Sequence, residues 1–199
     1  MKRFLSAFFA GILMFPISSL AEHHGNHFEF SILNSSWDTG ISNVSGATLD
    51  KDDTGFAIVW GGPFTDNIDL EIGYADFGET SLSGSSGNTF DYKGTSYVFT
   101  ATGTIAVEGD SFFVGIKPKM SLTDSLDAYA RFGLTSWDTI LTASSASGSA
   151  DTSDDGVDLY YGFGVSGNIS GFTVSLSHSI YEFDADDVDS TALSISVKF

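Results

Sequence analysis

The chain alternates apolar and polar residues through most of its length, and this period constrains the fold more than any other feature. In FEFSIL, Phe28, Phe30 and Ile32 fall on one face, whereas Glu29 and Ser31 fall on the other. The same alternation recurs in segments beginning near residues 55, 68, 112, 126, 157, 172 and 193. A period of two is typical of β-strands with one apolar face. The sequence therefore predicts an all-β chain with eight strands.

The connections between these strands alternate in length. The predicted tight turns are 63–67, 121–125 and 168–171, the long loops are 38–53, 78–110 and 138–155, and 184–190 is intermediate. Within 78–110, the stretch SYVFTATGTIAV is expected to extend strands beyond the barrel. Short turns at one end and long loops at the other are typical of an up-and-down outer-membrane barrel. Its even strand count places both termini at the short-turn, periplasmic end.

A soluble barrel, with its apolar face turned inward, would show the same period. Two features favour the membrane. The polar faces consist mostly of Ser, Gly, Thr and Ala, which suits the narrow interior of an eight-stranded barrel. Aromatic residues near the strand ends, namely Trp60, Tyr74, Phe112 and Phe172, are typical of interfacial girdles. We therefore predict an eight-stranded antiparallel transmembrane β-barrel.

The N-terminus has the features of a signal peptide. Lys2 and Arg3 precede the apolar run FLSAFFAGILMF, and small residues precede a predicted cleavage after Ala21. Residues 1–21 are thus assigned to the signal peptide and 22–199 to the barrel. The alternative, an N-terminal anchor, is less favoured because the run is shorter than the roughly 20 residues of a spanning helix. Among partners, the net charge of −18 excludes nucleic acid.

Several motifs, taken in order, resemble the OmpA-like outer-membrane β-barrel domain. They are IDLEIGYADFGE, DAYARFGLTSWD, DLYYGFGVSGNIS and LSISVKF, and the resemblance covers about residues 25–199. It does not include the peptidoglycan-binding periplasmic domain of full-length OmpA proteins, so we expect a barrel-only member without wall anchoring. The resemblance implies a Gram-negative outer membrane. It also implies that the barrel assembly machinery recognises the terminal pattern Leu193, Ile195, Val197 and Phe199.

Five charged residues fall on the predicted lumen face: Glu29, Glu71, Lys117, Arg131 and Lys198. Glu71, Lys117 and Arg131 lie at comparable depth on consecutive strands. Glu29 and Lys198 are expected to face each other where the first and last strands meet. Because unpaired charges in a narrow interior are costly, we predict an ion-pair network that plugs the barrel. A gate that controls a small conductance is the alternative function of the same network.

Histidines raise two further possibilities. In EHHGNH, His24 would be the third residue after cleavage, an arrangement that chelates Cu(II) or Ni(II), with His23 and His27 assisting. A mobile His-rich leader is favoured over this metal site. His178 lies on the apolar face of its strand, as does the catalytic His of lipid A deacylases, but Ile180 stands where those enzymes carry the Ser nucleophile. No catalytic residue is therefore assigned.

The predicted outer loops concentrate acidic residues and tryptophans. DKDD (50–53), DTSDD (151–155) and DADDVD (184–189) could bind Ca²⁺, but none has the spacing of an EF-hand loop, so hydrated acidic loops are the default. Trp37 and Trp137 share the inward parity and are expected to cap the lumen at its outer rim.

These observations predict a non-enzymatic protein of the outer membrane, with a structural or surface-interaction role. We expect a monomer without cofactor, in contact with lipid and lipopolysaccharide. The alternative is a narrow channel for small solutes or hydrophobic molecules. A lipid A-modifying barrel enzyme is a less favoured third reading.

Overall fold

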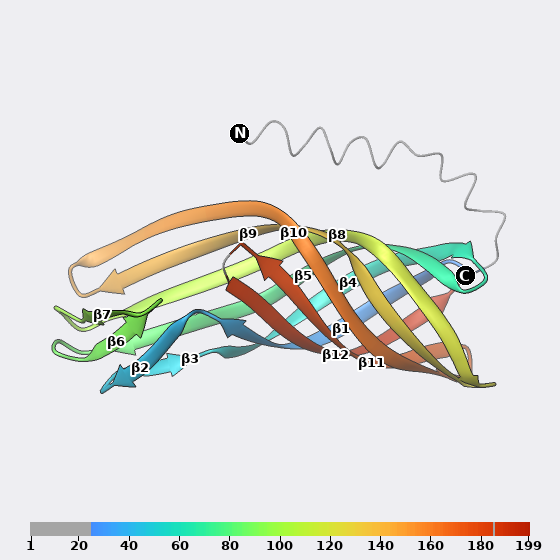
Figure 1. The fold of residues 1–199 in the computed structure, drawn as a ribbon, viewed down its shortest axis with the longest axis horizontal. Coiled ribbons are helices and arrows are strands. Elements are labelled where there is room, and N and C mark those ends of the chain that lie inside the picture. Colours follow the sequence, from blue (N-terminus) through green and yellow to red (C-terminus); the bar gives the residue numbers. More distant parts are fainter. Residues whose placement is uncertain (1–24, 185) are drawn as a thin grey trace.

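The computed structural model describes residues 25–184 and 186–199, which are built from β-strands (Figure 1). The predicted signal peptide, 1–21, lies outside these residues. The strands are β1 (His27–Asp38), β2 (Ile41–Ser45), β3 (Thr48–Asp50), β4 (Asp52–Thr65), β5 (Ile68–Gly84), β6 (Thr89–Tyr92), β7 (Thr95–Val98), β8 (Gly103–Thr123), β9 (Leu126–Ser145), β10 (Gly148–Ile169), β11 (Phe172–Phe183) and β12 (Asp186–Lys198). Within the described residues, no helix is long and apolar enough to cross a membrane.

Eight of these strands close into an antiparallel ring. The order around the ring is β1, β12, β11, β10, β9, β8, β5 and β4, and β4 pairs again with β1. Closure removes the sheet edges that would otherwise leave backbone groups unpaired. The ring confirms the predicted eight-stranded antiparallel barrel.

The strands are staggered around the ring. A row of directly paired residues starts at His27 and returns to β1 at Trp37, ten residues further along (37 − 27). The row consists of His27, Gly61, Glu71, Gly115, Gly133, Tyr160, Tyr181, Val188 and Trp37. Such a stagger requires that the strands tilt against the barrel axis. One row of paired residues therefore climbs through the lumen.

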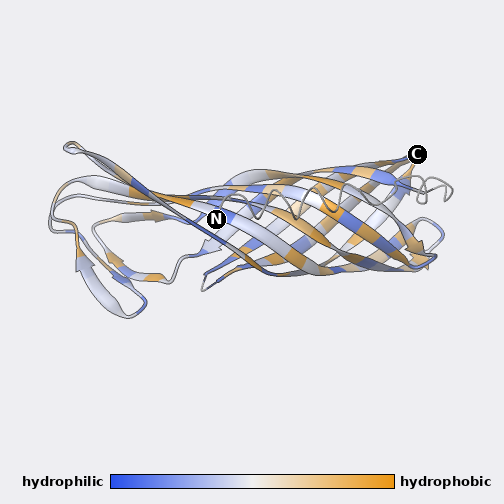
Figure 2. Cartoon of the chain, turned by 90° about the horizontal axis from the view of Figure 1, so that it is seen from above, coloured by the Kyte–Doolittle hydropathy of each residue, from blue (hydrophilic) through white to orange (hydrophobic). Residues whose placement is uncertain are grey.

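The outer surface of the ring is apolar and the inner surface is polar. On β1, Phe28 is 47% exposed and Ile32 54% exposed, whereas Glu29 is 1% exposed and Ser31 is buried. Apolar and polar residues alternate in the same way along the other ring strands (Figure 2). This is the arrangement that lipid outside and a filled lumen inside require, and it confirms the predicted parity.

The ring strands continue well beyond the barrel at the end opposite the C-terminus, forming an outer extension (Figure 1). Strands β5, β8, β9 and β10 supply most of it. A separate three-stranded sheet, β2-β6-β7, and the short strand β3 on β5 complete it. The prediction that SYVFTATGTIAV extends strands beyond the barrel is confirmed for residues 103–107, which belong to β8, whereas 96–98 belong to β7 of the separate sheet.

Three segments that were predicted as loops contain strands. Residues 38–53 contain β2 and β3. Residues 138–155 form a long hairpin, because β9 runs to Ser145 and β10 resumes at Gly148. Within the predicted loop 184–190, β12 already begins at Asp186. These segments are rich in Asp, Ser, Thr and Gly, so they show no regular apolar period. Their backbones pair all the same, because an antiparallel ladder in water needs no apolar face to satisfy its hydrogen bonds.

The C-terminal strand is held at the short-turn end of the barrel, as predicted. β12 pairs with β1 on one side and β11 on the other. The amide of Phe199 donates a hydrogen bond of 2.9 Å to the carbonyl of Asn26. The last residue is therefore fixed by backbone bonding rather than frayed.

Candidate functional site in the barrel lumen

Four charged side chains from four different strands meet inside the barrel. Glu29 comes from β1, Glu71 from β5, Lys117 from β8 and Arg131 from β9, and all four are buried. Arg131 contacts both carboxylates, with 2.8 Å from Nη2 to Glu29 Oε1 and 2.9 Å from Nε to Glu71 Oε2. Lys117 Nζ lies 3.1 Å from Glu71 Oε1 and 3.7 Å from Glu29 Oε2. We call these four residues the ion-pair cluster.

The ion-pair cluster balances two negative against two positive charges. Because each charge has an opposite partner within 4 Å, the cost of burying it is offset by attraction in a poorly screened interior. Tyr129 adds to this arrangement, since its ring centre lies 4.5 Å from Lys117 Nζ and 5.2 Å from Arg131 Cζ. The cluster therefore links four strands across the interior.

Lys198 does not join the ion-pair cluster. The register between β1 and β12 pairs Glu29 with Ser196, and Lys198 pairs with His27 instead. Lys198 is exposed at the short-turn rim. The prediction that Glu29 and Lys198 face each other is thus wrong by one inward-facing position, because sequence parity fixes the face of a residue but not its height.

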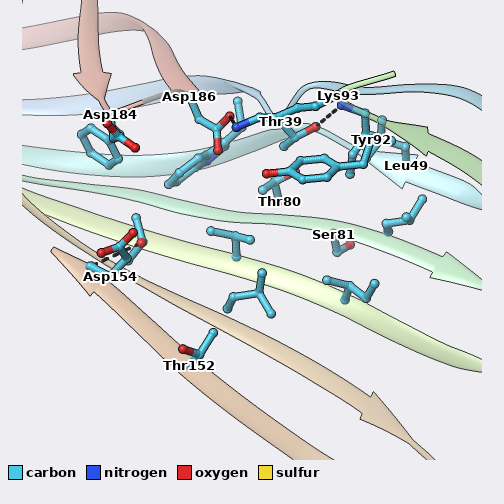
Figure 3. Close-up of a pocket in the computed structure, with 18 of the residues that line it drawn as sticks. Thr39, Leu49, Thr80, Ser81, Tyr92, Lys93, Thr152, Asp154, Asp184 and Asp186 are labelled. Carbon is cyan, nitrogen blue, oxygen red and sulfur yellow. Dashed lines mark hydrogen bonds and ion pairs between the residues drawn. The ribbon is translucent and has the colours of Figure 1, made fainter. Parts of the chain in front are cut away.

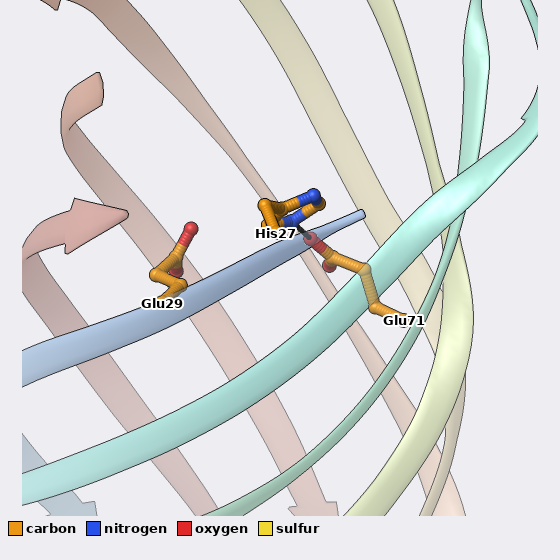
Figure 4. A group of neighbouring side chains, drawn as sticks. All are labelled: His27, Glu29 and Glu71. Carbon is orange, nitrogen blue, oxygen red and sulfur yellow. Dashed lines mark ion pairs between the residues drawn. The ribbon is translucent and has the colours of Figure 1, made fainter. Parts of the chain in front are cut away.

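His27 belongs to the lumen and not to a mobile leader. Its Nε2 lies 3.6 Å from Glu71 Oε1, and donor atoms of His27, Glu29 and Glu71 lie within 4.8 Å of one another (Figure 4). These residues could in principle hold a metal ion. The same two carboxylates, however, already contact Arg131 and Lys117, which a cation would have to displace. His23 and His24 lie outside the described residues.

One lumen pair was missed by the sequence analysis. Lys119 Nζ lies 2.7 Å and 2.9 Å from the two oxygens of Asp69, near the short-turn rim. In the sequence, the alternation that begins near residue 112 was followed only through FFVGIK, which ends at Lys117. β8 nevertheless continues to Thr123, and this places Lys119 on the inner face. A strand extended past Pro118 would have revealed the pair.

Above the ion-pair cluster, aromatic side chains fill the lumen. They are Trp37, Phe77, Phe113, Trp137, Tyr160, Tyr181 and Phe183, all buried. Their rings pack continuously, with centre separations of 5.0 Å for Phe113–Tyr160, 4.7 Å for Phe77–Tyr181 and 5.2 Å for Trp137–Phe183. We call this group the aromatic layer. It contains both tryptophans that were expected to cap the lumen.

Glycines on the facing strands make room for the aromatic layer. A Cβ at Gly115 would lie 2.3 Å from the Tyr160 hydroxyl, and one at Gly133 would lie 2.8 Å from its ring and 2.1 Å from the Val114 carbonyl oxygen. Both contacts are closer than packed atoms allow. The small residues at these positions are therefore what permits a tyrosine to lie across so narrow an interior.

The outer face carries the predicted aromatic and C-terminal residues. Tyr74 and Phe112 pack with ring centres 4.9 Å apart, and Phe56 lies 6.1 Å from Tyr74. Trp60 and Phe172 belong to a separate group, because Phe28 pairs with Trp60 and with Val197, which pairs with Phe172. The terminal residues Leu193, Ile195, Val197 and Phe199 are all exposed on this face.

His178 has polar neighbours that the sequence analysis did not identify. Its Nδ1 lies 3.2 Å from Thr191 Oγ1 and its Nε2 lies 3.5 Å from Asp189 Oδ1, both on β12. Ile180, at the position of the deacylase nucleophile, has an aliphatic side chain and pairs with Asp189. The contacts satisfy the polar atoms of an imidazole on the outer face.

Comparisons with known proteins agree with this architecture. The model of the OmpA-like transmembrane domain matches residues 31–174. The solved structure of Ail, the attachment invasion locus protein of Yersinia pestis, is similar with a TM-score of 0.55 at 16% identity, over 89% of this chain and 100% of Ail. The N-terminal β-barrel domain of Pseudomonas aeruginosa OprF gives a TM-score of 0.50 at 12% identity, over 88% of this chain and 99% of that domain. No curated protein sequence is significantly similar to the chain. The family match extends over most of the barrel, and the chain therefore belongs to the family of OmpA-like transmembrane domains.

Proposed function

We propose that this protein is an integral outer-membrane barrel with a structural or surface-interaction role and a lumen closed to permeation. Membership of the OmpA-like family supports the location. The observation that carries the closed lumen is the ion-pair cluster, in which Glu29, Glu71, Lys117 and Arg131 meet from four strands. The aromatic layer provides a second obstruction above it. A solute would have to disrupt both.

The exposed apolar face supports the partners of this proposal. Residues such as Phe30, Leu134 and Leu159 would contact lipid, and acidic outer loops would lie beside lipopolysaccharide. The C-terminal pattern ending at Phe199 would be read by the assembly machinery after export by the signal peptide. Closed pairing of every ring strand is compatible with a monomer.

The surface partner is not a sulfated sugar in this proposal. Ail of Yersinia pestis has been solved in complex with the heparin analogue sucrose octasulfate. Here the net charge is −18, and acidic runs such as 50–53 and 151–155 lie in the outer extension. Like charges would repel a polyanion. Similarity of fold to Ail therefore does not support assigning that ligand to this chain.

Planar bilayer recording tests the closed lumen. The full chain should give no discrete conductance steps. A variant that weakens both obstructions, Arg131→Ala combined with Tyr160→Ala and Tyr181→Ala, should give them. A heat-dependent shift on SDS gels verifies that each protein is a closed barrel. Steps from the unchanged chain would contradict the proposal and favour a narrow channel. Steps from Glu71→Ala or Arg131→Ala alone would indicate a gate.

A non-enzymatic role is part of the proposal. Mass spectrometry of lipid A from cells with and without the protein should give the same acyl pattern. The variant His178→Ala is the control, because it removes the one imidazole that contacts both Thr191 and Asp189. Loss of an acyl chain with the unchanged protein, but not with His178→Ala, would overturn this part and assign a hydrolase.

A further inference from the structure

The outer extension forms the walls of a half-open cavity of about 660 Å³ above the aromatic layer (Figure 3). Trp37, Trp137 and Phe183 line it on the barrel side, where the Trp137 and Phe183 rings stack 5.2 Å apart. Its walls include Leu49, Leu82, Ile105, Val107 and Leu141. A cavity of this size and lining is typical of a site for a small organic ligand.

The apolar walls result from an inversion of the strand pattern. In the barrel, β8 turns Phe112 and Val114 outward. In the outer extension, the same strand lines the cavity with Ile105 and Val107, so its apolar residues face inward. Apolar inner walls are unnecessary if the extension only displays loops to water. They indicate that this part of the extension takes up an apolar molecule.

A bulge in β5 contributes to the inversion. Pairing with β8 shifts between Asp76 and Glu79, and Gly78 adopts a φ of +73°. Before the bulge, buried Phe77 belongs to the lumen, and after it Thr80 and Leu82 are buried and line the cavity. The extra residue therefore changes which side chains face inward, so that Thr80 and Leu82 point into the cavity.

Charges around the cavity select among apolar ligands. The acidic lining residues are Asp154, Asp184 and Asp186, and the basic one is Lys93. Lys93 Nζ already lies 3.3 Å from Asp186 Oδ1 and stands 5.2 Å from the Tyr92 ring centre. The remaining carboxylates give the cavity a negative potential, which disfavours anions and favours neutral or cationic molecules.

We propose that this cavity is a binding site for an apolar small molecule, uncharged or cationic, taken up from the outer side of the membrane. The aromatic layer separates the cavity from the ion-pair cluster. The site is therefore a closed-ended receptor rather than the mouth of a channel, and it is independent of whether the lumen conducts.

Isothermal titration calorimetry of the full chain in lipid nanodiscs tests the site, with empty nanodiscs subtracted. The probes share one ring system and differ in charge: naphthalenemethanol, naphthylmethylammonium and naphthalenesulfonate. The neutral and cationic probes should bind saturably. The anionic probe should bind at least about tenfold more weakly. Absence of saturable heat for all three would overturn the site, and preferential binding of the sulfonate would overturn the charge selection.

Two neighbouring residues give a matched pair of variants. Leu141 lines the cavity and is 38% exposed, whereas Ile140 is 44% exposed and is not among the lining residues. Leu141→Arg should weaken the neutral probe by at least about tenfold, and Ile140→Arg should leave it unchanged. Thr152→Phe, which fills the cavity from β10, provides a second blocking variant. Equal binding by Leu141→Arg and Ile140→Arg would contradict the proposal.

Discussion

The same strands form both the barrel lumen and the outer extension, but the lumen is packed with side chains whereas the extension surrounds a cavity. In the lumen, charges pair across the interior and aromatic rings pack against glycines such as Gly133. In the extension, the strands surround a cavity of about 660 Å³. The difference follows from the surroundings: lipid outside the barrel requires apolar residues to point outward, and water outside the extension removes that requirement. Inward apolar walls then become possible.

The largest difference is expected within the lumen, between the buried ion-pair cluster and the Lys119–Asp69 pair at its short-turn rim. Arg131→Ala removes one of the two cations that both buried carboxylates contact, and should lower the free energy of unfolding by about 3–5 kcal/mol. Lys119→Ala breaks the Asp69 pair at the rim, where the Lys119 side chain is 31% exposed, and should cost at most about 1 kcal/mol. Urea unfolding in lipid vesicles, followed by tryptophan fluorescence, measures both. Equal costs would show that the ion-pair cluster is screened like a surface pair.

The next largest difference is expected when side-chain volume is added in the lumen and in the outer extension. Gly133→Ala places a methyl group against the Val114 carbonyl and the Tyr160 ring, and should destabilise the barrel by about 1–3 kcal/mol. Gly167→Ala is the matched control, because its nearest neighbour would be the Ser125 carbonyl oxygen at 3.7 Å. In the extension, Thr152→Phe adds a whole ring and should change stability by no more than about 0.5 kcal/mol. A large cost at Thr152 would contradict the open cavity.

The sequence predicted the barrel because lipid imposes a period that can be read directly. It also predicted four charges that lie together in the lumen, namely Glu29, Glu71, Lys117 and Arg131, but it missed Asp69 and Lys119. The height of a residue along the barrel axis was harder to predict from the sequence. Lys198 was misplaced because the register of β1 and β12 is fixed by pairing over the whole strand.

The outer extension was the least predictable part. Its strands are polar on the exposed side, so residues 138–155 read as a loop although they form a hairpin. Its apolar inner face was not recognised in the sequence, because the alternation of apolar and polar residues changes phase. On β8 the change lies between Val107 and Phe112, and on β5 it lies at the Gly78 bulge. A change of phase interrupts a period without ending a strand. Only the paired backbone reveals that the strand continues.

The smallest expected effect is acid sensitivity confined to the outer extension. Asp91 on β6 accepts hydrogen bonds from the Ser96 hydroxyl and from Asn43 Nδ2, at 2.6 Å for the latter. These bonds lower the pKa of Asp91 below its ordinary value. A lowered pKa in the folded state means that the bonds stabilise the β2-β6-β7 sheet above the ordinary aspartate pKa of about 4, and that this contribution is lost as the pH falls further.

Amide NMR spectra between about pH 6 and about pH 3 measure this effect. Signals from β6 and β7 should shift as Asp91 is protonated, and Asp91→Asn should abolish that dependence because an amide does not titrate. Amides of β1 on the ion-pair cluster side serve as the internal reference. If β6 and β7 keep their signals unchanged to the lowest pH, the small sheet does not depend on Asp91. Backbone pairing and the packing of Phe90 on Tyr97, with ring centres 5.6 Å apart, would then be sufficient to hold β6 to β7.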